Sequence, residues 1–195
     1  GYDWYGDVVD SAPAAAAAPG AFRRLLVNPV CERDFNEGCR ACGGKGALLS
    51  KETMRLVRDA LAAFPGAAAE VVCDKHGGRT RYATLLMETL QPACLVPEAE
   101  TAGLSRYRLT LGGRDVAISF RAKADAHDPP AALASMAAKY VRELFMEALN
   151  RFFLGRLPGL RPTAGYYADG LRFLSEVEPL LGELRCDRGG FVRER

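Results

Sequence analysis

Three polar side chains, Ser135, Lys139 and Arg142, follow one another at spacings i, i+4 and i+7 in an otherwise apolar segment. This spacing places all three on one face of a helix. The two cations of such a face would contact phosphate groups or organise neighbouring carboxylates. A solvated helix face gives the same pattern, so the spacing alone leaves a binding role and a purely structural role open.

Two aspartates, Asp74 and Asp125, are the carboxylates best placed to act with this face. Asp74 closes the apolar run at 68–73, and α/β proteins commonly place their chemistry at the carboxyl ends of strands. A single aspartate at the end of a strand is also a common turn former. His127 and Asp128 lie beside Asp125, and we interpret them as an exposed histidine and a helix cap rather than as further ligands.

Three of the six cysteines cluster as C-x7-C-x2-C, at Cys31, Cys39 and Cys42. A structural zinc ion takes four ligands, so a fourth would come from a distant side chain. The candidates for this fourth ligand are His76, Cys94 and Cys186. The alternative is six reduced thiols, as expected in a cytoplasmic protein, because the first residues, GYDWYGDVVD, lack the pattern of a secretory signal.

The composition is that of a folded domain. Hydrophobic residues make up 49% of the 195 residues and charged residues 26%, which is ample apolar material for a core. The mean hydropathy is −0.07, and the longest apolar stretches fall short of the about 18 residues that a membrane helix needs, so we expect no membrane partner. The formal net charge of +2 predicts no strong nonspecific binding to nucleic acid, so a polyanion site would be local.

The first third of the chain contains one clear helix. Residues 1–20 end in the low-complexity run SAPAAAAAPG, and we treat residues 1–30 as an irregular N-terminal segment before a single domain at 31–195. Residues 21–30 favour a short strand or helical turn, and the Cys- and Gly-rich residues 31–46 favour a loop. A helix follows from Ser50, its predicted N-cap, with Met54, Val57, Leu61 and Phe64 on one face and Pro65-Gly66 at its end.

The middle of the chain predicts strands. Residues 68–74 read as a short buried strand that the Gly77-Gly78 turn closes. Residues 82–104 are ambiguous, and we interpret them as a short helix and a proline-interrupted loop. Alternating apolar residues on both sides of Gly112-Gly113 predict a hairpin at 105–121.

The last third predicts two helices. Asp128 followed by Pro129-Pro130 is a well-specified helix start, and the helix would extend for about six turns to Gly155. Residues 156–167 favour a loop. A final helix from Ala168 would be limited by Pro179. Strands therefore lie among helices without a repeating unit, which indicates an α/β or α+β class.

Residues 123–143, K-A-D-A-H-D-P-P-A-A-L-A-S-M-A-A-K-Y-V-R-E, combine a turn, a helix cap and a patterned helix face. This segment resembles, without a gap, the most recognisable part of the ribonucleases HII (type 2 ribonucleases H). In that family a catalytic Asp in a G/A-D-A-like turn leads into a helix patterned A-A-S-x-x-A-K-x-x-R-D. The residues that match are Asp125, Ser135, Lys139 and Arg142, with Glu143 in place of the last Asp.

The resemblance extends more loosely over residues 48–180. Asp74 resembles the catalytic Asp that ends a central strand in these enzymes; its separation from Asp125 is longer than in the family, and the hairpin at 105–121 accounts for the extra length. Gly165-Tyr166 resembles the family's G-Y motif, whose tyrosine stacks near the ribonucleotide and reads its 2′-hydroxyl. The histidine that follows this motif in the family is not evident.

The family's first motif has no counterpart in residues 1–30. These enzymes begin with a strand carrying D-E-A-G-R-G, which supplies half of a four-carboxylate site and a glycine turn that grips the RNA–DNA junction. Asp3, Asp7 and Asp10 lack the strand and the turn. Two Mg²⁺ ions about 3.5–4 Å apart require several anionic oxygens, which two aspartates alone do not supply.

We therefore expect an α/β protein with a ribonuclease H-like fold, a central mixed sheet flanked by helices. The resemblance implies a Mg²⁺- or Mn²⁺-dependent endonuclease for RNA–DNA hybrids or ribonucleotide-containing DNA, with Asp74 and Asp125 as catalytic metal ligands. Substrate would be bound by Ser135, Lys139, Arg142 and Tyr166. The alternative is a catalytically inactive relative that binds nucleic acid or acts as a scaffold; protein partners are left open.

Overall fold

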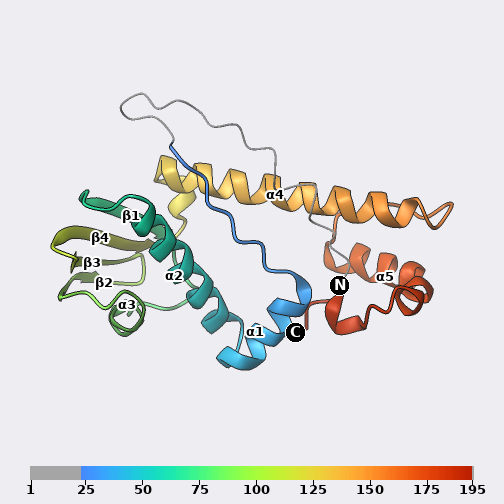
Figure 1. Cartoon of the computed structure of the whole chain (residues 1–195), viewed down its shortest axis with the longest axis horizontal. Helices are drawn as coiled ribbons and strands as arrows, with labels where there is room; N and C mark the ends of the chain where they lie inside the picture. Colours follow the sequence, from blue (N-terminus) through green and yellow to red (C-terminus); the bar gives the residue numbers. More distant parts are fainter. Residues whose placement is uncertain (1–22, 195) are drawn as a thin grey trace. The chain divides into compact units, whose positions relative to one another are not determined.

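Four strands pair into one mixed sheet, and five α-helices accompany them in the part of the chain that this computed structural model describes, residues 23–194 (Figure 1). The elements are α1 (Glu32–Cys42), α2 (Lys45–Ala63), β1 (Ala69–Asp74), α3 (Ala83–Leu90), β2 (Cys94–Glu100), β3 (Leu104–Leu111), β4 (Arg114–Arg121), α4 (Pro129–Leu154) and α5 (Tyr167–Glu183). Single 3-10 turns lie at Ala124–Ala126 and Arg188–Gly190. The α/β prediction is confirmed.

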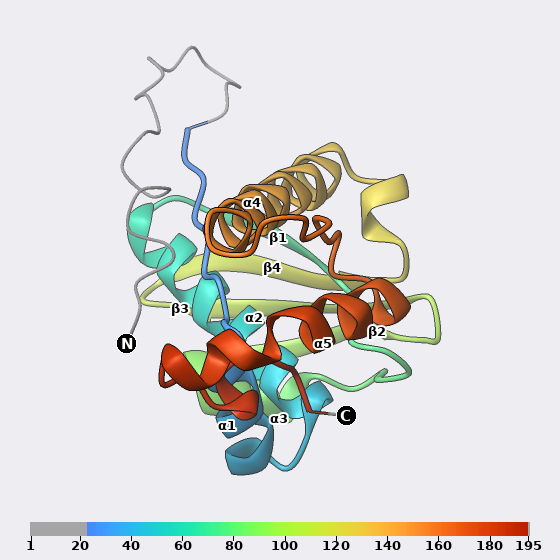
Figure 2. The same ribbon diagram turned by 90° about the vertical axis from the view of Figure 1, so that its right-hand side faces the viewer.

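The sheet has the order β1-β4-β3-β2, which Figure 2 shows strand by strand. β2, β3 and β4 form an antiparallel meander, and β1 lies parallel to β4, with Asp74 opposite Arg121. The predicted strand at 68–74 and the hairpin at 105–121 are therefore confirmed. In residues 23–194 no strand pairs with the other edge of β1.

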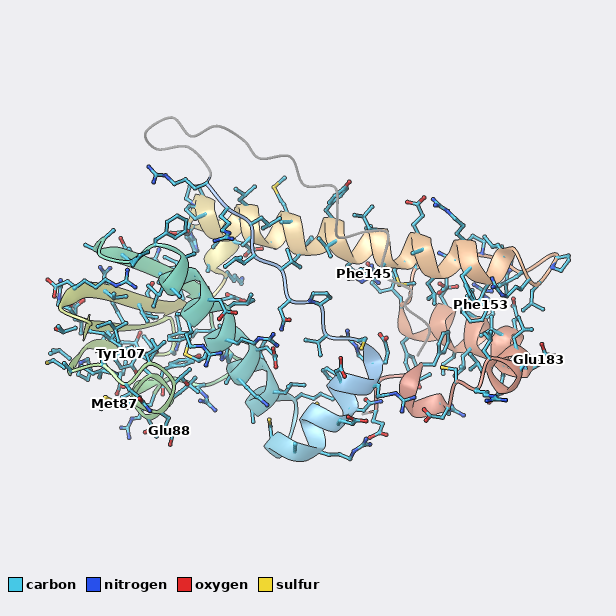
Figure 3. All side chains as sticks on the ribbon, viewed as in Figure 1. Met87, Glu88, Tyr107, Phe145, Phe153 and Glu183 are labelled. Carbon is cyan, nitrogen blue, oxygen red and sulfur yellow. The ribbon has the colours of Figure 1, made fainter. Side chains whose placement is uncertain are left out.

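One face of the sheet carries the main core. Directly paired residues of a sheet share a face, so Cys73, Phe120 and Ser105 point to the same side. Helices α2 and α3 cover this side with apolar side chains that include Met54, Val57, Leu61, Tyr82 and Leu86. Tyr107 lies inside this layer, whereas Met87 and Glu88 lie on the outer surface of α3 (Figure 3). The next residue along β1, Asp74, therefore points to the opposite, more polar face.

The described chain divides into two compact units, a first unit over residues 26–136, which contains the sheet, and a second unit that contains residues 137–194. The division falls within α4. The second unit packs the end of α4 against α5, where Phe153 meets Phe173 and Phe191 edge to face (Figure 3). The predicted N-terminal segment, residues 1–30, lies mostly outside the described residues; residues 23–30 form no regular element, in place of the predicted strand or turn.

Two predictions near the start of the chain are wrong. Residues 32–42 form α1 rather than a loop, because acidic residues in its first turn and Arg40 in its last complement the helix dipole, and Gly43 ends it in the left-handed conformation (φ 79°). Ser50 is not an N-cap. Helix α2 begins at Lys45, and the Ser50 hydroxyl donates to the Gly46 carbonyl at 2.9 Å inside the helix.

Two further differences involve proline. Residues 94–100 form β2 instead of a proline-interrupted loop; β2 is the outer strand of the described sheet, and its pairing shifts between Pro97 and Ala99, where a missing N–H is tolerated. Helix α5 continues through Pro179 to Glu183. Burial of Leu181 in the core of the second unit offsets the hydrogen bond that Pro179 removes.

The loop before α5 is held by a network around Asp169. Its carboxylate accepts hydrogen bonds from the Thr163 hydroxyl (2.6 Å), from Arg172 (2.7 Å) and from the Ala164 backbone N–H (2.8 Å). These donors lower the pKa of Asp169 to about 2. Asn150 also bonds both backbone groups of Thr163.

We expect the second unit to lose stability as the pH falls from about 4 to about 2. A carboxylate whose folded pKa is depressed stabilises the fold above its unfolded pKa and loses this contribution as it is protonated. Thermal unfolding followed between pH 6 and pH 2 should show this loss in the wild type and a weaker one in Asp169→Asn. The exposed Glu178→Gln in the same helix is the control and should follow the wild type. Parallel curves for Asp169→Asn and the wild type would contradict the assignment.

Candidate functional site

The candidate site lies at the carboxyl ends of the parallel strands β1 and β4. Asp74 ends β1, and its Oδ1 atom accepts a hydrogen bond of 3.1 Å from the backbone N–H of Ala124, the residue before Asp125. Ala124 is buried and anchors the 3-10 turn, whereas Asp74 and Asp125 are both exposed. The structure therefore brings the turn that carries Asp125 against the end of the strand that carries Asp74.

The start of α4 completes this arrangement. Asp128 caps the helix by accepting a hydrogen bond from the Ala131 N–H at 3.0 Å, as predicted. One turn later the Ser135 hydroxyl lies 3.5 Å from Oδ2 of Asp125, at the long limit of a hydrogen bond. Ser135 thus lies next to Asp125, whereas Asp128 acts as the N-terminal cap of α4.

The loop after Asp74 is firmly anchored. The Lys75 ammonium donates to the carbonyls of Arg79 (3.2 Å) and Thr101 (2.7 Å), which ties the loop to the turn between β2 and β3. Gly77 has a φ of +59°, which favours glycine, and a Cβ at Gly77 or Gly78 would meet nothing within 4 Å. The loop is therefore held in place by Lys75, and the space around its two glycines is unoccupied by other residues.

His76 joins this loop to the core. Its Nδ1 atom lies 3.0 Å from the hydroxyl of Ser50, its ring packs edge to face against Tyr82 and Phe120, and its backbone N–H donates to the Tyr82 hydroxyl. Burial first, and then the charge of Arg79, lower the pKa of His76, while Asp74 opposes this shift. The neutral imidazole is therefore the dominant form at neutral pH.

Three cationic side chains belong to the segments that adjoin Asp74 and Asp125 in the chain or in the sheet. Arg121 is the register partner of Asp74 and shares its face of the sheet. Lys123 directly precedes the 3-10 turn and is exposed, and the Arg79 guanidinium lies 5.7 Å from the centre of the Tyr82 ring. A pair of carboxylates in such surroundings suits a phosphate or a phosphate-bound cation.

Lys139, Arg142 and Tyr166 belong to the second unit. Arg142 stacks over the ring of Tyr166 at 5.2 Å, donates to the Ala164 carbonyl at 2.5 Å and pairs with Glu143 at 2.6 Å. Tyr166 is 69% exposed, and Lys139 is exposed on α4. The structure thus stacks Arg142 on Tyr166. In the unit that contains the sheet, it places the turn that carries Asp125 against Asp74, and Ser135 beside Asp125.

Gly165 is needed where Arg142 meets the loop. Its φ is +73°, and a Cβ there would lie 3.2 Å from the Met146 side chain and 3.4 Å from a guanidinium nitrogen of Arg142. Both the left-handed conformation and the close approach favour glycine. This position holds Tyr166 beside the arginine.

The cysteine cluster lies on α1. Cys39 and Cys42 are one turn apart on this helix, and the Cys31 thiol donates to Asp34 at 3.0 Å. All three are free thiols, and within residues 23–194 no group of three or more His, Cys, Asp or Glu side chains is arranged to hold a metal ion. The zinc hypothesis stays a prediction. Burial raises the pKa of Cys73, on the core face of β1, to about 12.

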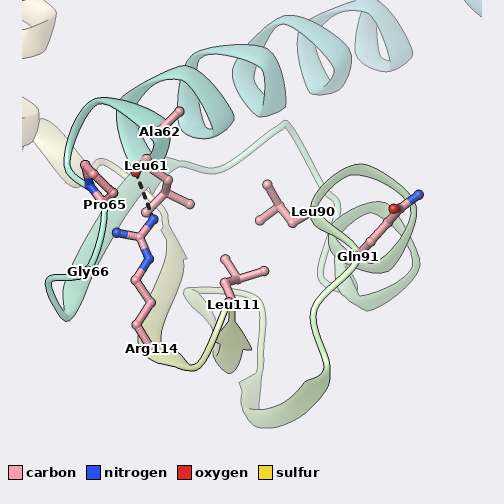
Figure 4. Close-up of a pocket in the computed structure, with 9 residues that line it drawn as sticks. Leu61, Ala62, Pro65, Gly66, Leu90, Gln91, Leu111 and Arg114 are labelled. Atoms are coloured by element: carbon pink, nitrogen blue, oxygen red, sulfur yellow. Dashed lines mark hydrogen bonds between the residues drawn. The ribbon is translucent and has the colours of Figure 1, made fainter.

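A pocket of about 380 Å³ lies at the other end of the strands, away from Asp74 (Figure 4). Leu61, Leu90 and Leu111 line it, and Arg114 donates from its edge to the carbonyls of Leu61 and Phe64 at the end of α2. The arginine therefore completes the helix terminus. None of the predicted site residues lines this pocket.

No protein-family model, curated protein or solved structure matches the chain. Also, none of the helices in the described range is long and apolar enough to cross a membrane.

Sequence analysis missed two residues of the loop after Asp74. Arg79 had no assigned role, and His76 was considered only as a distant zinc ligand. A signal was present in the sequence, because Asp74 is followed by a Gly-Gly turn and then by an arginine. By itself, this pattern predicts only the end of a strand.

Proposed function

We propose that the chain is a divalent-metal-dependent phosphodiesterase of the ribonuclease HII type, with a ribonuclease H-like fold, that cleaves RNA in RNA–DNA hybrids or ribonucleotide-containing DNA. Asp74 and Asp125 are its metal ligands in this proposal. The topology of the sheet supports this proposal. Strands β2, β3 and β4 form an antiparallel meander, β1 pairs parallel to β4, and Asp74 lies at the end of β1.

The observation that carries the proposal is the hydrogen bond from the Ala124 N–H to Asp74. It joins the end of β1 to the turn that carries Asp125, which follows Asp74 by 51 residues in the sequence. Both carboxylates are exposed, so they are accessible to a hydrated cation and to a phosphate. If Asp74 acted only as a turn former, it would not require another aspartate, Asp125, directly after the residue to which it is hydrogen-bonded.

The donor set fits one magnesium or manganese ion. Mg²⁺ is commonly held by one or two carboxylates, with substrate phosphates and water completing six oxygen ligands. Asp74 keeps its Oδ2 atom for this purpose, and Asp125 contributes its carboxylate. The ion would supply an activated water or stabilise the leaving oxygen. A second ion would need further oxygens from the nucleic acid or from another segment.

The chain's own cations would position the nucleic acid. Arg79, Arg121 and Lys123 would contact phosphates beside the two carboxylates, and Ser135 would orient Asp125. In the second unit, taken by itself, Lys139 and Arg142 offer contacts to phosphate, and the exposed ring of Tyr166 offers a stacking surface for a nucleotide. Such contacts read the backbone and shape of the nucleic acid rather than its base sequence.

A second candidate is a catalytically inactive nucleic-acid-binding protein. One observation favours it: the described residues offer two carboxylates here, and no group of three or more potential ligands. Binding without hydrolysis would use the same cations and the same tyrosine.

Cleavage of a labelled DNA duplex that carries one ribonucleotide, with Mg²⁺ or Mn²⁺, tests the proposal. We expect cleavage next to the ribonucleotide, none of an all-DNA duplex, and none by Asp125→Asn. Asp115→Asn is the matched control, because Asp115 is an exposed aspartate near the other end of β4. Binding without cleavage at any metal concentration would favour the inactive relative, and activity that is indifferent to Asp125→Asn would refute the site.

A further inference from the structure

Two thiols lie one turn apart at the end of α1 and have no part in the proposed cleavage. Cys42 is the last residue of this helix, and Cys39 precedes it by three residues. Side chains at i and i+3 lie on the same face of a helix, one above the other. The rise and radius of an α-helix put their Cα atoms about 5 Å apart, inside the range of about 4.4–6.8 Å that disulfides use. Both thiols are free and half-buried.

The chain after Cys42 leaves room for the two sulfur atoms to meet. In a regular helix the Cβ atoms of such a pair are about 5–6 Å apart, whereas a disulfide needs about 3.5–4.5 Å. Cys42 therefore has to move by about 1 Å, which is easiest in the last turn of a helix. Gly43 and Gly44 follow with φ values of +79° and +130°, and a Cβ at either position would meet nothing within 4 Å. The Gly44 N–H donates to the Cys39 carbonyl at 2.8 Å, the outer bond of a Schellman motif, which keeps the turn closed.

The contact between α1 and α2 keeps the two thiols in this arrangement. Gly38, one residue before Cys39, packs so closely on α2 that a Cβ there would lie 2.7 Å from the side chain of Leu48. The last turn of α1 is therefore held in the folded protein, as a short free peptide would not hold it. A thiol held one turn from its partner has an effective concentration of about a millimolar or more, so a reaction between the two outpaces reactions with dissolved thiols.

The other four cysteines are less suited to pairing. Cys31 precedes Cys39 by eight residues, which is about 12 Å along a helix, and its thiol donates to an aspartate of the same helix. Burial raises the pKa of Cys31, and it raises the pKa of Cys73 to about 12, so neither thiol readily becomes a reactive thiolate. Cys94 lies on β2 and Cys186 lies after α5, and neither shares its element with another cysteine.

We propose that Cys39 and Cys42 form a redox dithiol that exchanges with small disulfides such as glutathione disulfide. One cysteine thiolate attacks a sulfur atom of the small disulfide, which gives a mixed disulfide and releases one reagent thiolate. The other cysteine thiolate then attacks the bonded protein sulfur, closes the disulfide and releases the second reagent thiolate. The protein loses two electrons and two protons, and the small disulfide becomes two thiols. This inference does not depend on the proposed nuclease function.

Oxidation of the native full-length chain, followed by peptide mapping, tests the proposal. The reduced protein is mixed with glutathione disulfide, free thiols are blocked, and the digest is analysed by mass spectrometry. Trypsin cleaves after Arg40, between the two cysteines, so a Cys39–Cys42 disulfide joins two peptides that separate on reduction. We expect this linked pair in the wild type and the return of both thiols after dithiothreitol. A link between other cysteines, a persistent mixed disulfide, or no oxidation of this pair would overturn the proposal.

Single substitutions identify the intramolecular step. Cys39→Ser and Cys42→Ser each lack the second thiol, so each should hold at least about tenfold more mixed disulfide than the wild type. Cys31→Ser is the matched control, because it removes a thiol from the other end of the same helix, and it should behave as the wild type. Equal amounts of mixed disulfide in the wild type and in the two variants would refute an intramolecular exchange.

Metal analysis of the same preparation separates this proposal from the zinc hypothesis. We expect the two thiols to oxidise at the same rate with and without a chelator. One zinc ion per chain that protects both thiols from glutathione disulfide would overturn the dithiol proposal. It would favour a metal site that includes Cys31, Cys39 and Cys42.

Discussion

Asp74→Asn is expected to reduce cleavage of the ribonucleotide-containing duplex by more than a factor of about 100, because it removes a negative charge from the proposed cation site. The amide oxygen of the new side chain can still accept the hydrogen bond from the Ala124 N–H, so the turn that carries Asp125 stays in place. The loss should therefore appear in kcat and in the metal concentration required, with little change in melting temperature.

A second substitution at the same position distinguishes charge from anchoring. Asp74→Ala removes the acceptor as well, so it should abolish cleavage and also lower the melting temperature. Asp115→Asn, which removes an equal charge from the other end of β4, should change neither. An Asp74→Asn protein as active as the wild type would show that Asp74 is only a turn former.

Phe120→Ala should lower the free energy of unfolding by about 3–5 kcal/mol, the usual cost of removing a buried aromatic ring. Phe120 is fully buried on the core face of β4 and stacks on Tyr82, with ring centres 3.7 Å apart and planes 4° apart. The cavity would open beneath the ring of His76, which packs on the same two residues. Urea denaturation measures the change.

Phe64→Ala is the control for this substitution. Phe64 follows the end of α2 and is 42% exposed, so its removal should cost less than about 1 kcal/mol. If the two variants lost similar stability, the core would not be centred on β4.

Local signals explain which elements could be predicted. The alternation of apolar residues around Gly112-Gly113 and the helix cap at Asp128 are signals contained within short stretches of the chain. The hairpin and the helix α4 both formed where these signals predicted them. Ser50 failed as a cap because the same residue type is favourable at a helix start and tolerated inside one, where it bonds the preceding turn. Pro179 failed as a stop because the core contacts of Leu181 are not visible in local sequence.

In the candidate site, too, local sequence predicted the elements that carry the residues but not the contacts between those elements. The motif at 123–143 placed Asp125, Ser135, Lys139 and Arg142 in the right local elements, a turn and the helix after it. It could not show that Ala124 donates to Asp74, because that contact depends on the parallel pairing of β1 with β4. Nor could it show the role of Ser50, which reaches His76 across 26 residues.

By itself the sequence determined the apolar periodicity, the turns and the caps, because these depend on interactions between residues close together in the chain. Tertiary structure alone decided which side of the sheet Asp74 faces, which turn contacts it and that Ser50 lies beside His76. Each of these follows from strand register or from contacts between distant segments, and a one-residue shift in register would turn Asp74 into the core.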